Sequence, residues 1–223
     1  MDDQVGKRRD FSSRRLGSHS QGDLQMLSEY LEKRVNIAVE KGDRDEEGNA
    51  YGGLGDVYVL QGDFRKAIEY YEKHLKIAKE IGNLARAGGA YANFGTPYCS
   101  LVQILKVIEY HEKRLKIALK IGDRAGEGRA YANLGNAYCS LGAFRKAIEY
   151  HEKHMKITIE IGDRPGKGRS YANLANAYYP LGDFRKAIKC YETHLKIAIK
   201  VGDRAGEAVV YGNLGNSYRS LGD

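Results

Sequence analysis

The feature that most constrains this 223-residue chain is an internal repeat with a period of 40 residues. The clearest repeat runs from Gly122 to Ile161, and the segment from Gly162 to Val201 follows it almost position by position. The remaining segments in the same register are a half repeat at 22–41, full repeats at 42–81 and 82–121, and a half repeat at 202–223. We number the full repeats one to four. A fixed period of this size indicates units that stack, because one unit cannot bury its own apolar face.

Each repeat carries two runs with helical spacing. In repeat three, the first run is Tyr131, Leu134, Gly135 and Tyr138, with offsets of 0, 3, 4 and 7. The second run has offsets of 0, 3, 4, 7 and 11, at Phe144, Ala147, Ile148, His151 and Met155. Such spacing places apolar residues on one face of an α-helix. The repeat is therefore predicted to form a helical hairpin.

We accordingly expect an all-α, right-handed solenoid of stacked antiparallel helical hairpins without strands. The predicted helices are 24–40, 44–60, 63–81, 84–100, 103–121, 124–140, 143–161, 164–180, 183–201 and 204–220. Asp123 is a candidate N-cap, and Leu181-Gly182-Asp183 is typical of a turn in which glycine ends one helix and aspartate begins the next.

Repeat two departs most from this pattern. Pro97 falls inside its first predicted helix, where it removes an amide that would reach the carbonyl of Asn93. The turn reads Leu101-Val102-Gln103, so both the glycine and the capping aspartate are missing. We expect this repeat to be the weakest. In repeat four, Pro180 is expected to shorten the first helix.

The residues of the first run also resemble a known family. Tyr131-x2-Leu134-Gly135-x2-Tyr138, followed by Ala147, resembles the tetratricopeptide repeat (TPR) signature with tyrosine in place of the leading tryptophan. The closing proline of that signature is absent. The Leu-Gly-Asn triplets at 134–136 and 214–216, with Gly-Asp-Arg at the junctions, resemble the Pins-class adaptors of spindle orientation and the long animal proteins of the tetratricopeptide repeat protein 28 type.

Polar residues recur at fixed positions of the first helices. The candidate binding residues are Arg129, Asn133, Asn136, Arg169, Asn173, Asn176, Asn213 and Asn216. Residues three and four apart share a helix face, so stacking would turn them into two asparagine ladders and a short arginine ladder. An amide offers a donor and an acceptor, and the arginine fork suits carboxylates. The alternative is that one asparagine position satisfies buried backbone groups between hairpins.

The family resemblance implies where these ladders lie and what they bind. In TPR proteins the first helices line a concave groove, and in the spindle-orientation adaptors arginine and asparagine there hold extended acidic peptides. We therefore expect a non-enzymatic scaffold whose partners are other proteins, bound through extended and acidic segments. Gly89 and Val209 stand where the other repeats have arginine, so the correspondence fails in repeat two and in the half repeat at 202–223.

No catalytic, cofactor or metal site is predicted. Cys99, Cys139 and Cys190 show no CxxC spacing. His151 and His154 are three residues apart, but tyrosine or arginine occupies the same positions in other repeats, which favours packing over metal binding. No Ser-His-Asp arrangement typical of a catalytic triad and no phosphate-binding loop stands out in the sequence.

The net charge and residues 1–21 lead to further expectations about surface, location and partners. The net charge is +7 and the pI about 9.1, with most charge expected as exposed pairs such as Glu69–Lys73, Glu109–Lys113 and Glu149–Lys153. Residues 1–21 are expected to be a disordered or frayed basic lead-in. Without a signal sequence or membrane span, a cytoplasmic location is expected. Two alternatives remain open: self-association through the exposed last helix, and, less favoured by the charge pattern, RNA binding.

Overall fold

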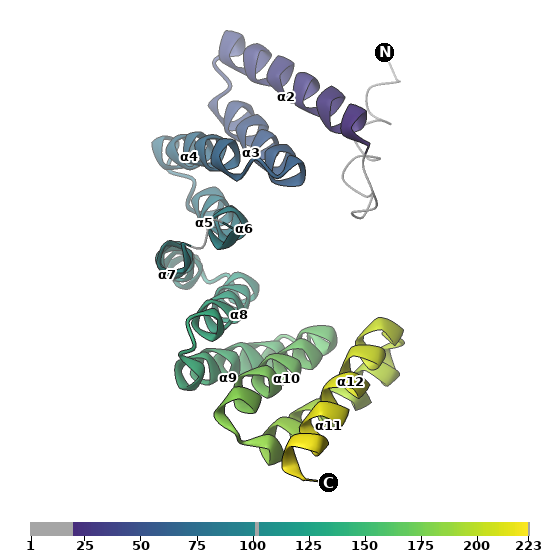
Figure 1. The fold of residues 1–223 in the computed structure, drawn as a ribbon. Coiled ribbons are helices and arrows are strands. Elements are labelled where there is room, and N and C mark those ends of the chain that lie inside the picture. The colour runs from purple at the N-terminus through teal and green to yellow at the C-terminus, as the bar shows by residue number, and fades with distance from the viewer. Residues whose placement is uncertain (1–19, 101–102, 223) are drawn as a thin grey trace. The chain divides into compact units, whose positions relative to one another are not determined.

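The computed structural model describes residues 20–100 and 103–222, and throughout these residues the ordered elements are helices (Figure 1). The expected lead-in at 1–21 lies outside the described residues except for its last two positions. The chain divides into two units, of which the first ends at His74 and the second begins at Leu75. Each unit is described by itself.

The first unit consists of α2 (Gln21–Lys41), α3 (Arg44–Gln61) and the start of α4 (Phe64–Glu80). Helix α2 begins earlier than expected because Ser20 and Asp23 form a reciprocal capping box. Helices α2 and α3 pack together. Their shared core consists of Leu24, Leu31, Leu54 and Val57, each almost completely buried.

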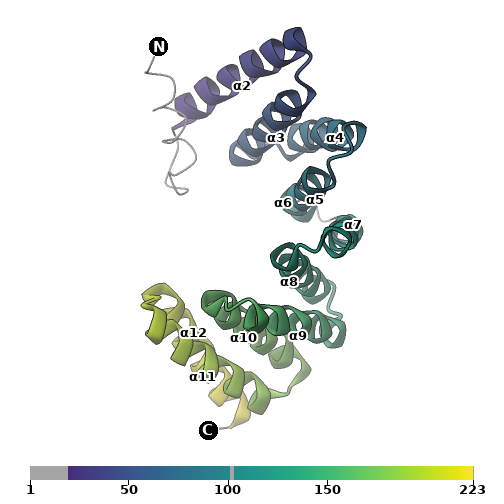
Figure 2. The same ribbon diagram turned by 180° about the vertical axis from the view of Figure 1, so that it is seen from behind.

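The second unit continues the alternation of first and second helices. Its elements are α5 (Leu84–Asn93), α6 (Gly95–Ser100), α7 (Ile104–Ile121), α8 (Arg124–Ser140), α9 (Phe144–Glu160), α10 (Arg164–Tyr178), α11 (Phe184–Val201) and α12 (Arg204–Leu221). From α7 onward each helix packs on the next one in the chain, and α8 also contacts α10 (Figure 2). The first helices of repeats three and four are therefore neighbours.

The turn devices predicted from the sequence are confirmed. Gly62, Gly142 and Gly182 all have φ between 72° and 78°, a conformation that glycine adopts without strain. The carboxylates of Asp63 and Asp183 accept hydrogen bonds from the amides of Lys66 and Lys186. These bonds satisfy orphan donors at the start of each second helix.

Proline alters the first helices of repeats two and four. The expected helix at 84–100 is instead two helices, α5 and α6, interrupted at Phe94. The predicted single helix is wrong because Pro97 cannot donate the amide that would continue the ladder. Gln103 precedes α7 without a side-chain cap, as expected, and Val102 lies outside the described residues. In repeat four α10 ends at Tyr178 and a short 3-10 helix, Tyr179–Leu181, contains Pro180, which confirms the predicted shortening.

The two helices of a hairpin approach closely at a small residue. In repeat three the ring of His151 packs directly on Gly135, and in repeat one Tyr71 packs on Gly55. Ala147 is fully buried at the crossing.

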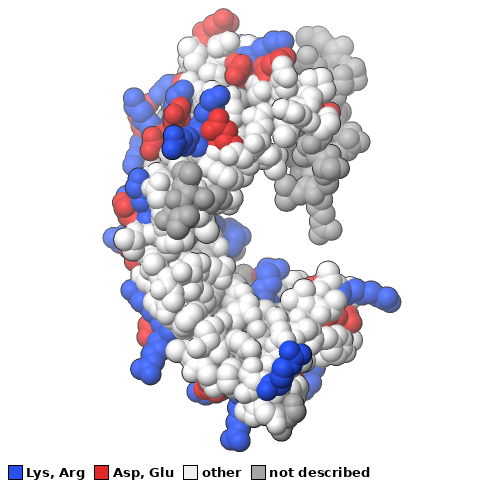
Figure 3. Space-filling model, in the orientation of Figure 1, with Lys and Arg blue, Asp and Glu red and all other residues white. Residues whose placement is uncertain are grey.

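Acidic and basic side chains are intermixed over α3 and α4, while the visible face of α10 to α12 carries few charges (Figure 3).

Candidate functional site

The predicted arginines lie at the start of two neighbouring first helices. Arg129 is on α8 and Arg169 is on α10, and their side chains are 61% and 65% exposed. Each guanidinium group is near one aspartate: Nη2 of Arg129 lies 3.9 Å from Oδ2 of Asp123, and Nη2 of Arg169 lies 3.6 Å from Oδ2 of Asp163. Exposed pairs at such distances contribute little to stability. Both guanidinium groups therefore remain accessible to an anionic ligand.

The same aspartates fix the helix starts that carry the arginines. Oδ1 of Asp123 accepts a hydrogen bond from the amide of Gly126 at 2.8 Å, and Asp163 holds the amide of Gly166 at the same distance. Each carboxylate thus uses one oxygen to cap the helix and turns the other toward the arginine. This arrangement confirms the predicted N-cap at Asp123.

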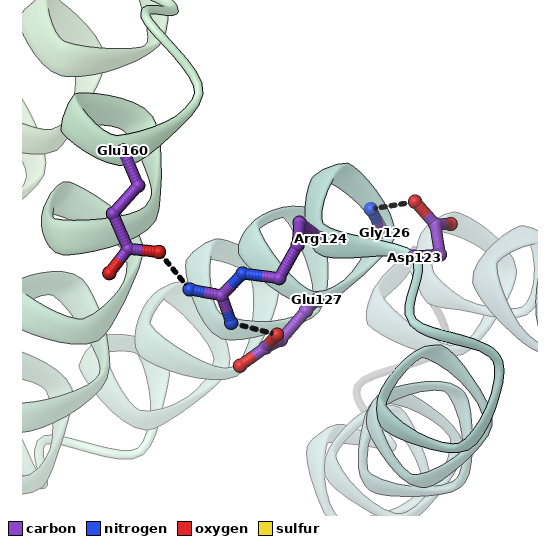
Figure 4. Close-up of polar contacts among 5 residues, drawn as sticks. All are labelled: Asp123, Arg124, Gly126, Glu127 and Glu160. Carbon is purple, nitrogen blue, oxygen red and sulfur yellow. Dashed lines mark hydrogen bonds and ion pairs between the residues drawn. The ribbon is translucent and has the colours of Figure 1, made fainter.

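An ion-pair network that the sequence analysis missed anchors α8 against α9. Arg124 pairs through one terminal nitrogen with Glu127 and through the other with Glu160, close to the cap formed by Asp123 (Figure 4). Glu127 is 6% exposed, and a charge in such a largely buried position is unfavourable unless it is paired. Arg124 provides the compensating charge. The sequence signal is the spacing Arg-x2-Glu at the start of the helix, which also occurs at Arg44 and Glu47. The network fixes the position of the helix that presents Arg129.

The two asparagine ladders have different surroundings. Asn133, Asn173 and Asn213 are half-buried, whereas Asn136, Asn176 and Asn216 are exposed. Oδ1 of Asn176 accepts a hydrogen bond from the hydroxyl of Tyr191 at 2.6 Å. Asp56, at the same repeat position, accepts from Tyr71 at 2.7 Å. In repeats one and four this position therefore accepts from a tyrosine hydroxyl of the second helix and not from a buried backbone group.

Histidine in place of that tyrosine changes the environment of Asn136. His151 stands where repeat four has Tyr191, and its ring is completely buried. Burial and, to a smaller extent, the neighbouring His154 together lower the pKa of His151 to about 4. Within the described part of the chain, the side-chain amide of Asn136 has no hydrogen-bond partner. Asn136 is thus available to a ligand, and Asn176 is already engaged through its oxygen.

Most of the expected glutamate–lysine pairs are replaced by contacts with aromatic rings. Glu109 does pair with Lys113. Nζ of Lys73 instead lies 4.8 Å from the ring centre of Tyr70, and Nζ of Lys153 lies 5.2 Å from that of Tyr150. The tyrosines are stacked, as at Tyr58–Tyr70 and Tyr138–Tyr150, where the ring centres are 5.3 Å apart. A cation over these electron-rich faces is attracted to them. Lys73 and Lys153 make these ring contacts and form no ion pair with Glu69 and Glu149, so the expected pairing there is wrong.

His151 and His154 contact different side chains. Nδ1 of His154 lies 3.0 Å from Oγ of Ser170, and Nε2 of His151 lies 4.0 Å from Sγ of Cys139. Across residues 20–100 and 103–222, no group of three or more histidine, cysteine, aspartate or glutamate side chains is arranged to hold a metal ion. In the same residues no helix is both long and apolar enough to cross a bilayer.

The family follows from the sequence comparison. A family model described as the tetratricopeptide repeat matches residues 15–80 and 162–223, and a second model with this description matches residues 130–165. The first model alone matches more than half of the chain. The chain belongs to the tetratricopeptide repeat family. No curated protein matches the sequence.

Solved structures show the same TPR fold at low sequence identity. BtubC (BKLC) from P. vanneervenii has a TM-score of 0.79 and 23% identity over 90% of this chain and 85% of its own. Aspartyl phosphate phosphatase F from Bacillus subtilis has a TM-score of 0.77 and 18% identity over 86% of this chain, which spans only 52% of that protein. TPR-like repeats of a putative kinesin light chain from Podosopora anserina have a TM-score of 0.69 and 19% identity, covering 89% of this chain and 93% of theirs. TPR proteins are generally non-enzymatic interaction scaffolds.

Proposed function

We propose that this TPR protein binds extended, acidic peptide segments of partner proteins along the first helices of repeats three and four. The observation that carries the proposal is the pair Arg129 and Arg169, two exposed guanidinium groups on helices that pack side by side. Each is held only loosely by an aspartate whose other oxygen caps the helix. A carboxylate that offered both oxygens would be a better partner for the guanidinium fork.

Asparagine adds contacts suited to a peptide backbone. Asn136 is exposed on the same helix face as Arg129 and carries a free donor and acceptor within the described residues. Asn133 and Asn173 are half-buried beside the arginines, and Asn216 is exposed on α12. The resemblance of the Leu-Gly-Asn triplets to those of the Pins-class adaptors supports this class of ligand by analogy. A cytoplasmic location remains an expectation from the sequence.

The test compares two double variants with equal charge. Arg129→Ala with Arg169→Ala removes the proposed site, whereas Arg145→Ala with Arg185→Ala removes two exposed arginines from the start of second helices. The probe is a fluorescein-labelled dodecapeptide of alternating glutamate and serine, measured by fluorescence anisotropy. Each arginine of the site should contribute about 1.5–3 kcal/mol, so the first variant should bind at least 100-fold more weakly while the second stays near the parent.

Two results would contradict the proposal. Equal losses in the two variants would show that the peptide responds only to net charge, and no binding by the parent chain would remove the ligand class. Asn176 is left intact because its replacement would also break the bond from Tyr191. Circular dichroism of both variants controls for helicity.

Self-association is a second candidate with an observation of its own. Val209 and Tyr211 on α12 are 62% and 58% exposed in this chain. A face of this kind could pack against a second copy of the protein. Sedimentation velocity at increasing protein concentration tests it: a constant sedimentation coefficient excludes it, and a Tyr211→Ser variant should reduce any increase.

A further inference from the structure

A small cavity lies where repeats two and three meet, between α5, α7 and α8. Its volume is about 150 Å³. Gly88 and Gly89 from α5 and Ile117 from α7 form the small and apolar part of the lining. The polar part consists of Arg114 from α7, Arg129 from α8 and Asp123 from the turn between these helices. All these residues belong to the unit that begins at Leu75.

Arg114 is unusual among the arginines of this protein. Its side chain is half-buried, and among residues 20–100 and 103–222 it has neither a hydrogen-bond nor an ion-pair partner. Burial lowers the pKa of Arg114, and the positive charge of Arg129 lowers it further, while Asp123 acts in the opposite direction. A half-buried cation without a hydrogen-bonded partner is unfavourable, because it loses part of its hydration and gains no direct contact with an anion in return.

The charges around the cavity do not balance. Two guanidinium groups face a single carboxylate, and one oxygen of Asp123 is occupied by the amide of Gly126 at 2.8 Å. The other oxygen lies 3.9 Å from Arg129. The cavity therefore has an excess of one positive charge.

The sequence repeats show that this arrangement is confined to one junction. The position of Arg114 is histidine in the other full repeats, at His74, His154 and His194. In repeat three, Nδ1 of His154 is paired with Oγ of Ser170 at 3.0 Å. The residue that corresponds to Ser170 beside Arg114 is Ala130, which has no polar atom to offer. Gly89 replaces the arginine of the later repeats and leaves room for a ligand.

We propose that this cavity binds one carboxylate group, that of a glutamate or aspartate side chain, between the guanidinium groups of Arg114 and Arg129. The proposal rests on the proposed function, in which an acidic segment lies along α8 and α10. A carboxylate carries one negative charge, which matches the excess in the cavity, whereas a phosphate group carries nearly two. Repeat two has Gly89 on its first helix where repeats three and four have an arginine. Arg114, on the second helix of repeat two, supplies a positive charge in its place. One side chain held at this depth would set the register of the segment.

The first experiment titrates the full chain with sodium acetate at constant ionic strength and follows the arginine Nε–Hε resonances by NMR. We expect the resonances of Arg114 and Arg129 to shift along a saturable curve, while that of the exposed Arg145 changes little. In Arg114→Gln, the saturable shift of Arg129 should disappear. Shifts of Arg114 that are linear and no larger than those of Arg145 would overturn the proposal. Saturation by sodium phosphate at tenfold lower concentration would overturn the assignment to a carboxylate.

The second experiment separates this inference from the proposed function. Labelled hexaglutamate is titrated against the parent, Arg114→Gln, Arg114→His and the control Arg145→Gln. We expect both Arg114 variants to bind at least fivefold more weakly and the control to match the parent. If hexaglutamate binds the parent and the Arg114 variants equally, the cavity plays no part although the groove function stands. If hexaglutamate does not bind but the acetate titration saturates, the groove function fails and the carboxylate site stands. Arg114→His carries the residue of repeats three and four, so it should keep the fold, as circular dichroism can verify.

Discussion

At the scale of single residues, the buried histidines make the stability of the fold depend on pH. His111 is 3% exposed and His151 is completely buried, and burial lowers the pKa of each to about 4. In the unfolded chain these histidines take up protons near pH 6.5. Their contribution to the free energy of unfolding should therefore be fully present above that pH and should be lost as the pH drops toward 4. The loss is at most roughly 3 kcal/mol for each histidine.

Thermal unfolding followed by circular dichroism between pH 7.5 and 4.5 measures this dependence. His151→Tyr is a suitable variant because Tyr191 occupies the same position in repeat four. Its hydroxyl could donate to Asn136, as that of Tyr191 does to Asn176. The variant should lose less stability on acidification than the parent. An unchanged pH profile would show that His151 is not responsible.

A matched pair of glycines tests the close contact between helices. A Cβ at Gly135 would overlap the ring of His151, whereas a Cβ at Gly215, the same repeat position on α12, would meet no atom within 4 Å. Gly135→Ala should therefore destabilise repeat three by about 1–3 kcal/mol. Gly215→Ala should be stabilising by about 0.5–1 kcal/mol, because alanine favours the helix. Urea denaturation of both variants distinguishes these signs, and equal effects would contradict the packing argument.

At the scale of elements, we expect repeat two to be the least stable hairpin. Its first helix is interrupted at Phe94, Pro97 removes a ladder amide, and Gln103 provides no side-chain cap for α7. Amide hydrogen exchange should consequently be faster in residues 94–106 than in residues 134–146. Pro97→Ala should increase protection of this segment, since Ala137 and Ala177 occupy the same position in intact helices. Equal exchange of the two segments in the parent would refute this prediction.

At the scale of the whole molecule, the chain should not unfold as one cooperative unit. From α7 onward each helix packs mainly on its neighbours in the chain, and α2 packs on α3, so a local loss should remain local. Leu54 and Leu134 are equivalent and buried, with 1% and 0% exposure, and replacing either with alanine should cost about 2–5 kcal/mol. Hydrogen exchange should rise in residues 44–61 for Leu54→Ala and in residues 124–160 for Leu134→Ala. A uniform increase along the chain in either variant would indicate global cooperativity instead.

The sequence by itself determined the helices, the turns and the family. Helical spacing, glycine at the turns and aspartate at the caps are local signals, because each depends on residues within one or two turns of the chain. For that reason most helix boundaries and the shortening at Pro180 could be predicted, whereas the low stability of repeat two stays a prediction. The interruption at Phe94 was not predicted, since the sequence analysis expected one continuous helix over residues 84–100.

The tertiary structure decided which polar residues are free. Asn136 and Asn176 are the same residue type and both are exposed, but only Asn176 is hydrogen-bonded to a tyrosine of the facing helix. Arg114 and Arg129 lie on consecutive helices of different repeats, and they line one cavity only because the two hairpins stack. Such contacts depend on packing between helices, which local patterns do not encode. The candidate binding residues of a repeat protein can therefore be found from its sequence. Whether each side chain is free to bind a ligand depends on its neighbours in space.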